Sequence, residues 1–275
     1  MKYERVPLTD DHIHIDPRNG RGIEAAKDFL RAGGTHMFLV SKPSSSLGID
    51  PKQGNDYRAV FDETLRVAGS IRETGLVVFP VLGVHPAEIS RLAEHCSLEE
   101  ASLIMKGGLE AAAQYVEDGV AVALKSGRPH YETTGEIMAV SNSILLHAFT
   151  LAAELGCAVQ VHAESGPCSD MIDMAHSAGL DPGRVVKHYA TPDTPLVPSL
   201  LATHEAIPLL CREGRRLTME SDYMDENRSP GAVIGPKSVP RFTRRLLEED
   251  LISADDMYRI HTDTPSKVYG VEISL

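Results

Sequence analysis

The sequence predicts an α/β fold, a TIM (β/α)8 barrel that occupies residues 1–275 as a single domain. The length of 275 residues suits such a barrel, which is typically about 250 residues long. Short apolar runs alternate with longer amphipathic stretches, as they do where helices join parallel strands. Several amphipathic stretches end on a glycine just before the next apolar run, which is a common way to end a helix: Gly34, Gly75, Gly119 and Gly156.

Eight apolar runs rich in Val, Ile and Leu are the predicted strands of this barrel. They are residues 8–15, 35–41, 76–84, 120–125, 158–163, 184–190, 196–202 and 216–221. Stretches of helical period lie between most of them, such as residues 22–34 and 57–75. Residues 101–119 are expected to add one or two helical turns before the fourth strand. Residues 226–241 are rich in Pro and Gly, and they are expected to form an ordered loop at the active site.

The composition indicates a compact globular protein that does not bind polyanions in general. Apolar residues make up 42% of the chain, charged residues 24%, and the formal net charge is −12. This charge argues against general binding to nucleic acid or anionic membranes, although a local cationic pocket or a metal ion can still meet a phosphate. The four cysteines form no CxxC pair and are expected to be reduced thiols.

No stretch of the sequence is typical of a signal peptide or a membrane span. The first ten residues contain no apolar core, and the most apolar stretch, residues 75–84, is half the length that a span needs. We therefore expect a cytoplasmic protein with no membrane partner. The sequence carries no signal for an oligomeric state.

Polar side chains occur where several predicted strands end, and the active site of such a barrel lies at those strand ends. His12 and His14 are two residues apart, so both side chains point to the same face of the first strand. The residues that end strands four, five, six and eight are Lys125, His162, His188 and Asp222. Imidazoles from three strands and a carboxylate form a ligand set for one or two divalent ions. Zn²⁺ suits it best, with Mn²⁺, Co²⁺, Fe²⁺ or Mg²⁺ as alternatives.

A structural role is the alternative for each of these residues taken alone. A histidine at a strand end is more often held by structural hydrogen bonds, and a His-x-His pair can be incidental. The shared position at the carboxyl ends favours a metal site. Lys187 is expected to point away from the site, and Asp225 and Glu226 are expected on a loop surface. The histidines interpreted as structural or solvated are His36, His95, His147, His176, His204 and His261.

Five short motifs contain these residues in order along nearly the whole chain. They are DHIHID at 11–16, GVHPAE at 83–88, VQVHAES at 159–165, VVKHYA at 185–190 and MESDYMDE at 219–226. Their order resembles that of the amidohydrolase superfamily, and specifically of the TatD-related metal-dependent hydrolases. The resemblance implies a hydrolase that uses divalent ions to activate water, with Asp222 as a metal ligand and as the catalytic proton acceptor.

The resemblance departs at the fourth strand, where TatD-type enzymes carry a Glu and this chain has Lys125. Related amidohydrolases of the phosphotriesterase and dihydroorotase kind carry a Lys there, and its amine reacts with CO₂ to give a carbamate that bridges two metals. The resemblance therefore implies a carboxylated lysine in a binuclear metal centre. Two alternatives stay open: an unmodified Lys125 paired with Asp16 or Glu164, and a register in which Ser126 faces the site.

Further polar residues near the strand ends are candidates for substrate binding. They are His85, Arg128, His130 and Glu164. Arg128 and His130 follow the fourth strand and offer a bidentate fork and a donor to an anionic substrate. The alternative is a loop that is stabilised by its own ion pairs. Glu164 lies two residues after His162 and could also orient that ligand.

The expected function is metal-dependent hydrolysis of a small molecule, with anionic substrates included. The candidate substrates are a phosphoester, an ester or lactone, and a cyclic amide. One alternative is a TatD-type nuclease that acts on DNA or RNA ends, which the acidic composition disfavours. A second alternative is a catalytically silent barrel that binds a metabolite and purifies with no stoichiometric metal.

Overall fold

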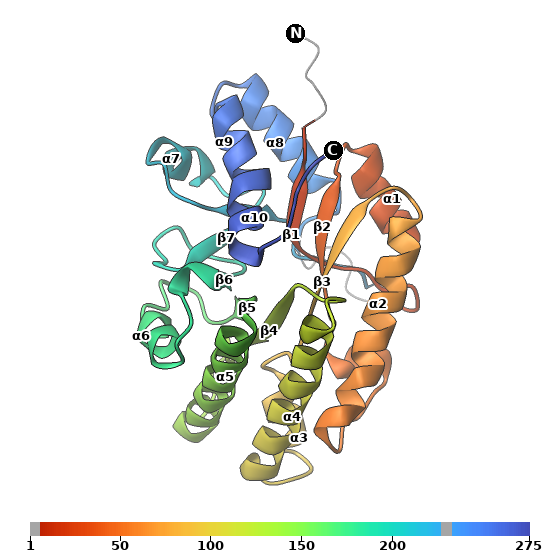
Figure 1. The fold of residues 1–275 in the computed structure, drawn as a ribbon, viewed down its shortest axis with the longest axis vertical. Helices are drawn as coiled ribbons and strands as arrows, with labels where there is room; N and C mark the ends of the chain where they lie inside the picture. The colour runs from red at the N-terminus through yellow and green to blue at the C-terminus, as the bar shows by residue number, and fades with distance from the viewer. Residues whose placement is uncertain (1–5, 227–232) are drawn as a thin grey trace.

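The computed structural model describes residues 6–226 and 233–275, which form a curled parallel sheet surrounded by helices (Figure 1). The strands are β1 Thr9–His14, β2 His36–Val40, β3 Val77–Gly83, β4 Ala123–Gly127, β5 Ala158–His162, β6 Val185–Lys187, β7 Val197–Leu201, β8 Thr218–Glu220 and β9 Tyr223–Met224. They pair in the order β8-β7-β6-β5-β4-β3-β2-β1-β9, and the pairs are parallel.

The helices alternate with these strands and form the outer layer of the barrel. They are α1 Ile23–Arg31, α2 Arg58–Arg72, α3 Glu88–Leu92, α4 Leu98–Glu117, α5 Gly135–Leu155, α6 Asp170–Ser177, α7 Ile207–Arg212, α8 Ser238–Glu248, α9 Ala254–Tyr258 and α10 Thr264–Tyr269. Short 3₁₀ turns are η1 Ser44–Leu47, η2 Gly54–Tyr57 and η3 Pro182–Arg184, and a π-helical turn, η4 Arg259–Asp263, joins α9 to α10. In Figure 1, α1 and α2 lie on one side of the strands and α6 and α7 on the other.

The sheet closes into a barrel where the chain leaves β8. The amide of Asp222 donates to the carbonyl of His12 over 3.0 Å, and β9 then pairs with the end of β1. Each of the eight predicted runs contains one strand, so the predicted TIM (β/α)8 fold is confirmed. The seventh run forms β7 although it contains Pro198.

Two predicted boundaries near the fourth strand are wrong. β4 continues to Gly127, so Lys125 lies in the middle of the strand instead of at its end. Residues 101–119 are not one or two extra turns, because nearly all of them belong to α4, a helix of 20 residues. A reciprocal capping box between Ser97 and Glu100 starts this helix before the predicted stretch begins.

The loop predicted at residues 226–241 is only partly described. Residues 227–232 lie outside the described residues, and α8 has already begun at Ser238. The glycine prediction holds for three helices, since Gly75, Gly119 and Gly156 have left-handed φ angles of 91°, 71° and 64°. After α1 the left-handed residue is Gly33, with φ 97°, and not Gly34.

The last helix covers the N-terminal end of the barrel interior. Val268 and Tyr269 of α10 are buried against the inward-facing apolar residues of the strands. The rings of Tyr269 and Phe38 lie 4.1 Å apart, and the Tyr269 hydroxyl donates to Asp11 Oδ2 over 3.2 Å. Among residues 6–226 and 233–275, the opposite end of the interior, where the strands finish, is therefore the end that can form a polar site.

Helix α5 is the one described helix that is long and apolar enough to cross a membrane, with 21 residues. The sequence analysis considered residues 75–84 for a span and did not consider α5. In the structure α5 lies between β4 and β5 and packs on the barrel through Ile144, Leu145 and Phe149. An apolar inner face is typical of the outer helices of such a barrel, which accounts for its composition.

Candidate metal centre

An irregular register in β1 directs two histidines into the barrel mouth. The pairing of β1 with β2 shifts between Asp10 and Ile13, which is the pattern of a β-bulge. Asp10 supports the bulge because its Oδ1 accepts from the amides of His12, at 3.3 Å, and Ser221, at 3.0 Å. Nε2 of His12 and Nε2 of His14 lie 3.2 Å apart, so both rings point to one place.

The other ring nitrogen of each histidine is anchored by the protein. His14 Nδ1 lies 2.9 Å from the Val40 carbonyl oxygen, which can only accept, so this nitrogen carries the proton. His12 Nδ1 lies 2.8 Å from Gln160 Oε1, and the amide nitrogen of Gln160 donates to the Asp11 carbonyl and the Tyr269 hydroxyl. His12 Nδ1 is therefore also the donor. Each Nε2 atom therefore carries a lone pair, and the two lone pairs face each other.

Three more imidazoles continue this cluster. His162 Nδ1 lies 2.7 Å from His188 Nε2, and His162 Nε2 lies 2.6 Å from His130 Nδ1. The ring of His188 stacks on that of His12 with centroids 4.0 Å apart, which joins the two groups. Nδ1 of His188 is buried and has no hydrogen-bond partner among the described residues.

Lys125 and Asp222 complete the set predicted as metal ligands. Lys125 Nζ lies 3.1 Å from His12 Nε2, and its side chain is buried. Asp222 has a left-handed φ of 44°, an uncommon conformation for a residue other than glycine. Its Oδ1 lies 3.9 Å from His12 Nε2, and one ligand atom each from His12, His188 and Asp222 lies within 4.8 Å of the others. The structure thus brings all six residues to one mouth.

The partners considered for an unmodified Lys125 are engaged elsewhere. Asp16 accepts from Lys42 Nζ over 2.7 Å, and Glu164 is paired with Arg128. Ser126 follows Lys125 in β4 and points to the opposite face of the strand. Neither the ion pairs with Asp16 or Glu164 nor the register with Ser126 in the site is present.

Burial sets the protonation of the cluster. It lowers the pKa of His12, His14 and His188 well below the ordinary value, so these imidazoles are neutral, the form that binds metals. Burial also lowers the pKa of Lys125 to about 8, although the carboxylates of Asp222 and Glu220 oppose this. Burial raises the pKa of Asp222 to about 6, against the opposing effect of Lys125.

The residues predicted to bind substrate fall into two groups. His85 and His130 line the mouth, each with its ring centroid 4.7 Å from that of His162. Arg128 instead donates to Glu164 and to Asp170, at 2.6 Å in the second case, and its side chain is buried. These contacts are the loop ion pairs considered as the alternative for Arg128. The same contacts hold the Glu164 carboxylate against Arg128. No described contact joins Glu164 to His162.

Sequence analysis missed two buried residues that touch the cluster. Gln160 lies two residues before His162, and Glu220 lies two residues before Asp222. A strand repeats its faces every two residues, so this spacing places each on the same face as a predicted ligand and could have revealed it. Glu220 Oε1 lies 3.7 Å from His188 Nδ1, and burial raises the pKa of this carboxyl well above its ordinary value.

Asp225 is not the surface residue that we expected, because it is fully buried. Its carboxylate accepts from the amides of Asp16, Arg21 and Gly22 at 2.7–2.9 Å, and from the Tyr223 hydroxyl at 2.9 Å. These bonds tie the loop after His14 to the turn after Asp222. Asp225 therefore positions two of the predicted ligand segments relative to each other.

The residues at the mouth fit a divalent metal ion. Two neutral imidazoles present Nε2 lone pairs to each other at 3.2 Å, and the partly buried carboxylate of Asp222 lies near them. Facing lone pairs repel unless a cation or a proton donor lies between them, and a divalent ion with imidazole and carboxylate ligands meets this requirement.

A parallel barrel with imidazoles and a carboxylate at its mouth is the arrangement expected of a metal-dependent hydrolase. The family described as TatD related DNase matches residues 9–270, and the chain belongs to this family. The protein is thus a metal-dependent hydrolase, and the alternative of a catalytically silent barrel is set aside.

Besides this family match, the chain is similar to individual proteins. The chain is 35% identical over 283 residues to an uncharacterized protein of Methanocaldococcus jannaschii, with 98% of each chain covered. A solved TatD homolog from Escherichia coli K12 is 16% identical, covers 97% of this chain and 98% of its own, and has a TM-score of 0.65. A mutant of a PTE-like lactonase from Deinococcus radiodurans is 15% identical, covers 96% and 95%, and has a TM-score of 0.64. At these identities the two solved structures show the fold.

Proposed function

We propose that this protein hydrolyses a small molecule, namely a phosphoester, an ester or lactone, or a cyclic amide, with one or two divalent ions at the barrel mouth. The observation that carries the proposal is the pair of facing Nε2 lone pairs on His12 and His14. The Lys125 amine can donate to one of them, but a divalent cation can satisfy both. Zinc is the favoured ion because imidazole nitrogen and carboxylate oxygen are its usual ligands.

The residues that would hold the metal are His12, His14, Lys125, His162, His188 and Asp222. When bound, a divalent ion lowers the pKa of its water and polarises a carbonyl or phosphoryl oxygen. Asp222 is proposed to accept the proton of the attacking water. Burial raises the pKa of Asp222 to about 6 in the metal-free protein, so Asp222 is a carboxylate at neutral pH and can accept a proton.

Lys125 is proposed to act as a carbamate. Burial lowers its pKa to about 8, which increases the fraction of neutral amine at neutral pH. The nitrogen lone pair then forms a bond to the carbon of CO₂ and releases one proton to solvent. The product is an anion with two oxygens, and it replaces the carboxylate that TatD-type enzymes carry at this strand.

His85 and His130 are proposed to contact the substrate, since both rings lie beside His162 at the mouth. A small substrate is favoured over a polynucleotide because the net charge of −12 repels a phosphate backbone. Hydrolysis of DNA or RNA ends stays the second candidate because the family is described as TatD related DNase.

The test is metal analysis followed by a substrate panel on the wild-type protein loaded with Zn²⁺, Mn²⁺ or Co²⁺. The panel contains a p-nitrophenyl phosphodiester, a lactone series, a hydantoin and single-stranded DNA. We expect one or two equivalents of metal and turnover of at least one small substrate. Purification with no transition metal even after supplementation, or turnover of DNA alone, would overturn the proposal.

The variant Asp222→Asn tests whether Asp222 accepts the proton of the attacking water. The variant should keep its fold and part of its metal while kcat falls roughly 100-fold or more, because the general base is lost. Asp118→Asn, at an exposed carboxylate after α4, is the control and should leave kcat unchanged. Equal turnover by Asp222→Asn and wild type would remove Asp222 from this role, or would identify the activity as a contaminant.

A further inference from the structure

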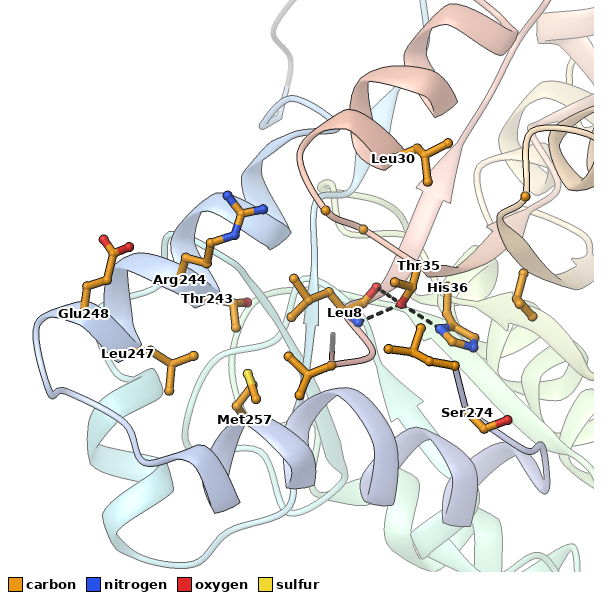
Figure 2. Close-up of a pocket in the computed structure, with 16 residues that line it drawn as sticks. Leu8, Leu30, Thr35, His36, Thr243, Arg244, Leu247, Glu248, Met257 and Ser274 are labelled. Atoms are coloured by element: carbon orange, nitrogen blue, oxygen red, sulfur yellow. Dashed lines mark hydrogen bonds between the residues drawn. The ribbon is translucent and has the colours of Figure 1, made fainter. Parts of the chain in front are cut away.

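A second cavity lies at the opposite end of the barrel from the histidine cluster. Its volume is about 520 Å³, and it is surrounded by Leu8 before β1, the first residues of β2 and β3, and the helices α8 and α9 (Figure 2). Leu8 lines it just before β1, and β1 then runs to His14 at the mouth. At about 3.3 Å per residue, the six residues of β1 separate the two sites by roughly 20 Å. The cavity is therefore no part of the metal centre.

The wall of this cavity is mostly apolar. Leu8, Leu30 and Val77 line it from the barrel side, and Leu247 and Met257 line it from α8 and α9. Figure 2 shows the side chains of Leu8, Leu30, Leu247 and Met257 around the open space. A volume of this size with a largely apolar lining is in the range that holds a small organic molecule.

The polar groups on the cavity floor already bind each other. The Thr35 hydroxyl accepts from the Leu8 amide over 2.8 Å and lies 3.1 Å from the Leu8 carbonyl and 2.8 Å from His36 Nδ1 (Figure 2). Burial lowers the pKa of His36 to about 4, so its ring is neutral at pH 7. The floor thus offers no charge to a ligand.

One cation at the rim has no partner among residues 6–226 and 233–275. The Arg244 guanidinium lies over Gly33, where an added Cβ would be 2.5 Å from Nη2. Gly33 has φ +97°, so a residue without a side chain is required there, and this leaves room for the guanidinium. Neighbouring cations differ, because Arg245 is paired with Glu249.

The acidic residue nearest in sequence does not neutralise Arg244. Glu248 lies one turn further along α8, and the two side chains form no ion pair. Figure 2 shows its carboxylate at the far end of the helix, pointing away from the guanidinium. Arg244 is exposed at the rim, so its guanidinium is a solvated cation that can meet the head group of an anion at the mouth of an apolar cavity.

We propose that this cavity binds an amphipathic monoanion, an unbranched carboxylate whose apolar chain fills the space while its head group pairs with Arg244. The inference goes beyond the proposed hydrolase function, because the ligand does not reach the metal centre. The guanidinium offers two parallel N–H donors to a carboxylate, and the aliphatic wall accepts the chain.

Isothermal titration of decanoate into the metal-loaded protein tests this site. We expect saturable binding of one equivalent, and no binding of decyltrimethylammonium, which has the same chain and the opposite charge. Arg244→Ala should weaken decanoate binding about tenfold or more, because a charge-assisted pair is lost. Arg245→Ala is the matched control on the same helix and should bind as wild type does. Val77→Trp should block the cavity, and its thermal unfolding will show whether the variant is folded.

Each other outcome would overturn the inference. Decanoate that binds equally well to Arg244→Ala, or that binds no better than the cationic chain, would exclude recognition of the head group. Binding that disappears in Asp222→Asn and survives in a folded Val77→Trp would place decanoate at the metal centre. None of these results depends on whether the hydrolase proposal is correct.

Discussion

The two histidine pairs at the barrel mouth are held in different ways. His12 and His14 each give one ring nitrogen to a protein oxygen, from Gln160 and Val40 respectively. His162 instead has both ring nitrogens against other imidazoles, and Nδ1 of His188 has no partner in the described part of the chain. The β1 pair is therefore oriented before any ligand binds, whereas the rings on β5 and β6 need a ligand to fix them.

This difference predicts an order of metal binding. A ligand whose ring is already fixed loses little rotamer freedom when the ion arrives, so the β1 pair should form the tighter site. Lys125 contacts that pair through His12, and Asp222 lies on the same side. The variants below either remove this preorganisation or test the groups that lack it.

The largest effect is expected at Lys125, which contacts the anchored pair. Lys125→Ala should lose one or both metals, and kcat should fall roughly 100-fold or more because the proposed bridging anion is gone. A short carboxylic acid added in solution should restore part of the activity. Lys125→Glu should be milder, since it supplies a carboxylate at the position where TatD-type enzymes have one.

The measurement at Lys125 is metal content together with electron density at its end, in crystals grown near neutral pH with bicarbonate and metal. A bare ammonium more than about 4 Å from any bound ion would exclude the carbamate. An unmodified Lys125 would not affect the difference in anchoring between the pair His12 and His14 and the pair His162 and His188.

Gln160→Leu breaks the anchor of His12 directly. Without the oxygen that fixes its Nδ1 proton, the ring can turn or change tautomer, so metal affinity should fall about 10- to 100-fold. Glu220→Gln is the matched change beside the unanchored His188. Burial raises the pKa of Glu220 well above its ordinary value, which favours the neutral carboxyl, and an amide is close to that form in size and shape. Competition with a chelator measures both, and equal losses in the two variants would contradict the distinction.

The sequence predicted the strands of the fold because each buried strand is a compact apolar run between helical stretches. The predicted ligands were chosen by their position and by the order of their motifs, and the structure brings them together because the carboxyl ends of parallel strands meet at one edge of a barrel. The ends of the helices and strands were predicted less accurately. A capping box moved the start of α4, and β4 runs two residues further than its apolar run because Ser126 and Gly127 pair with β5.

The residues that support the predicted ligands could not be identified from the sequence in the same way. Asp225 looks like a loop residue, yet its carboxylate collects three backbone amides that lie about 200 positions away in the chain. Such partners exist only after the barrel closes. The pairing of Arg128 with Asp170 is equally dependent on where β4 and α6 meet.

Substitutions of Arg128 test whether the loop beside His162 and His188 binds substrate or only supports the barrel. Because its buried guanidinium is taken by Glu164 and Asp170, Arg128→Ala should destabilise the fold by about 2 kcal/mol. Arg128→Lys keeps the charge but loses the fork, and should recover part of this. Urea unfolding measures the loss. A rise in KM for anionic but not neutral substrates, with unchanged stability, would instead support the substrate-binding role predicted from the sequence.

The smallest effect concerns His261, a buried histidine outside the cluster whose two ring nitrogens are both held by the protein. The Thr9 amide donates to Nδ1 over 3.1 Å, and Nε2 lies 2.8 Å from the Thr243 hydroxyl, an arrangement that suits the neutral ring. Burial lowers its pKa to about 4, against 6.5 for an unperturbed histidine. The unfolded chain therefore takes up a proton first as the pH falls, and stability is lost between pH 6.5 and pH 4.

For His261 alone this linkage amounts to about 1 kcal/mol between pH 7 and pH 5.5. Urea unfolding of the wild type and of His261→Gln at the two pH values measures it, because the contribution of the histidine cluster is the same in both proteins and cancels in the difference. The variant should be less stable than the wild type at pH 7, where the bonds to Thr9 and Thr243 are lost. Its stability should also fall less on acidification. If both proteins lose the same free energy between pH 7 and pH 5.5, His261 is protonated in the folded state, and two fixed nitrogens do not keep a buried ring neutral.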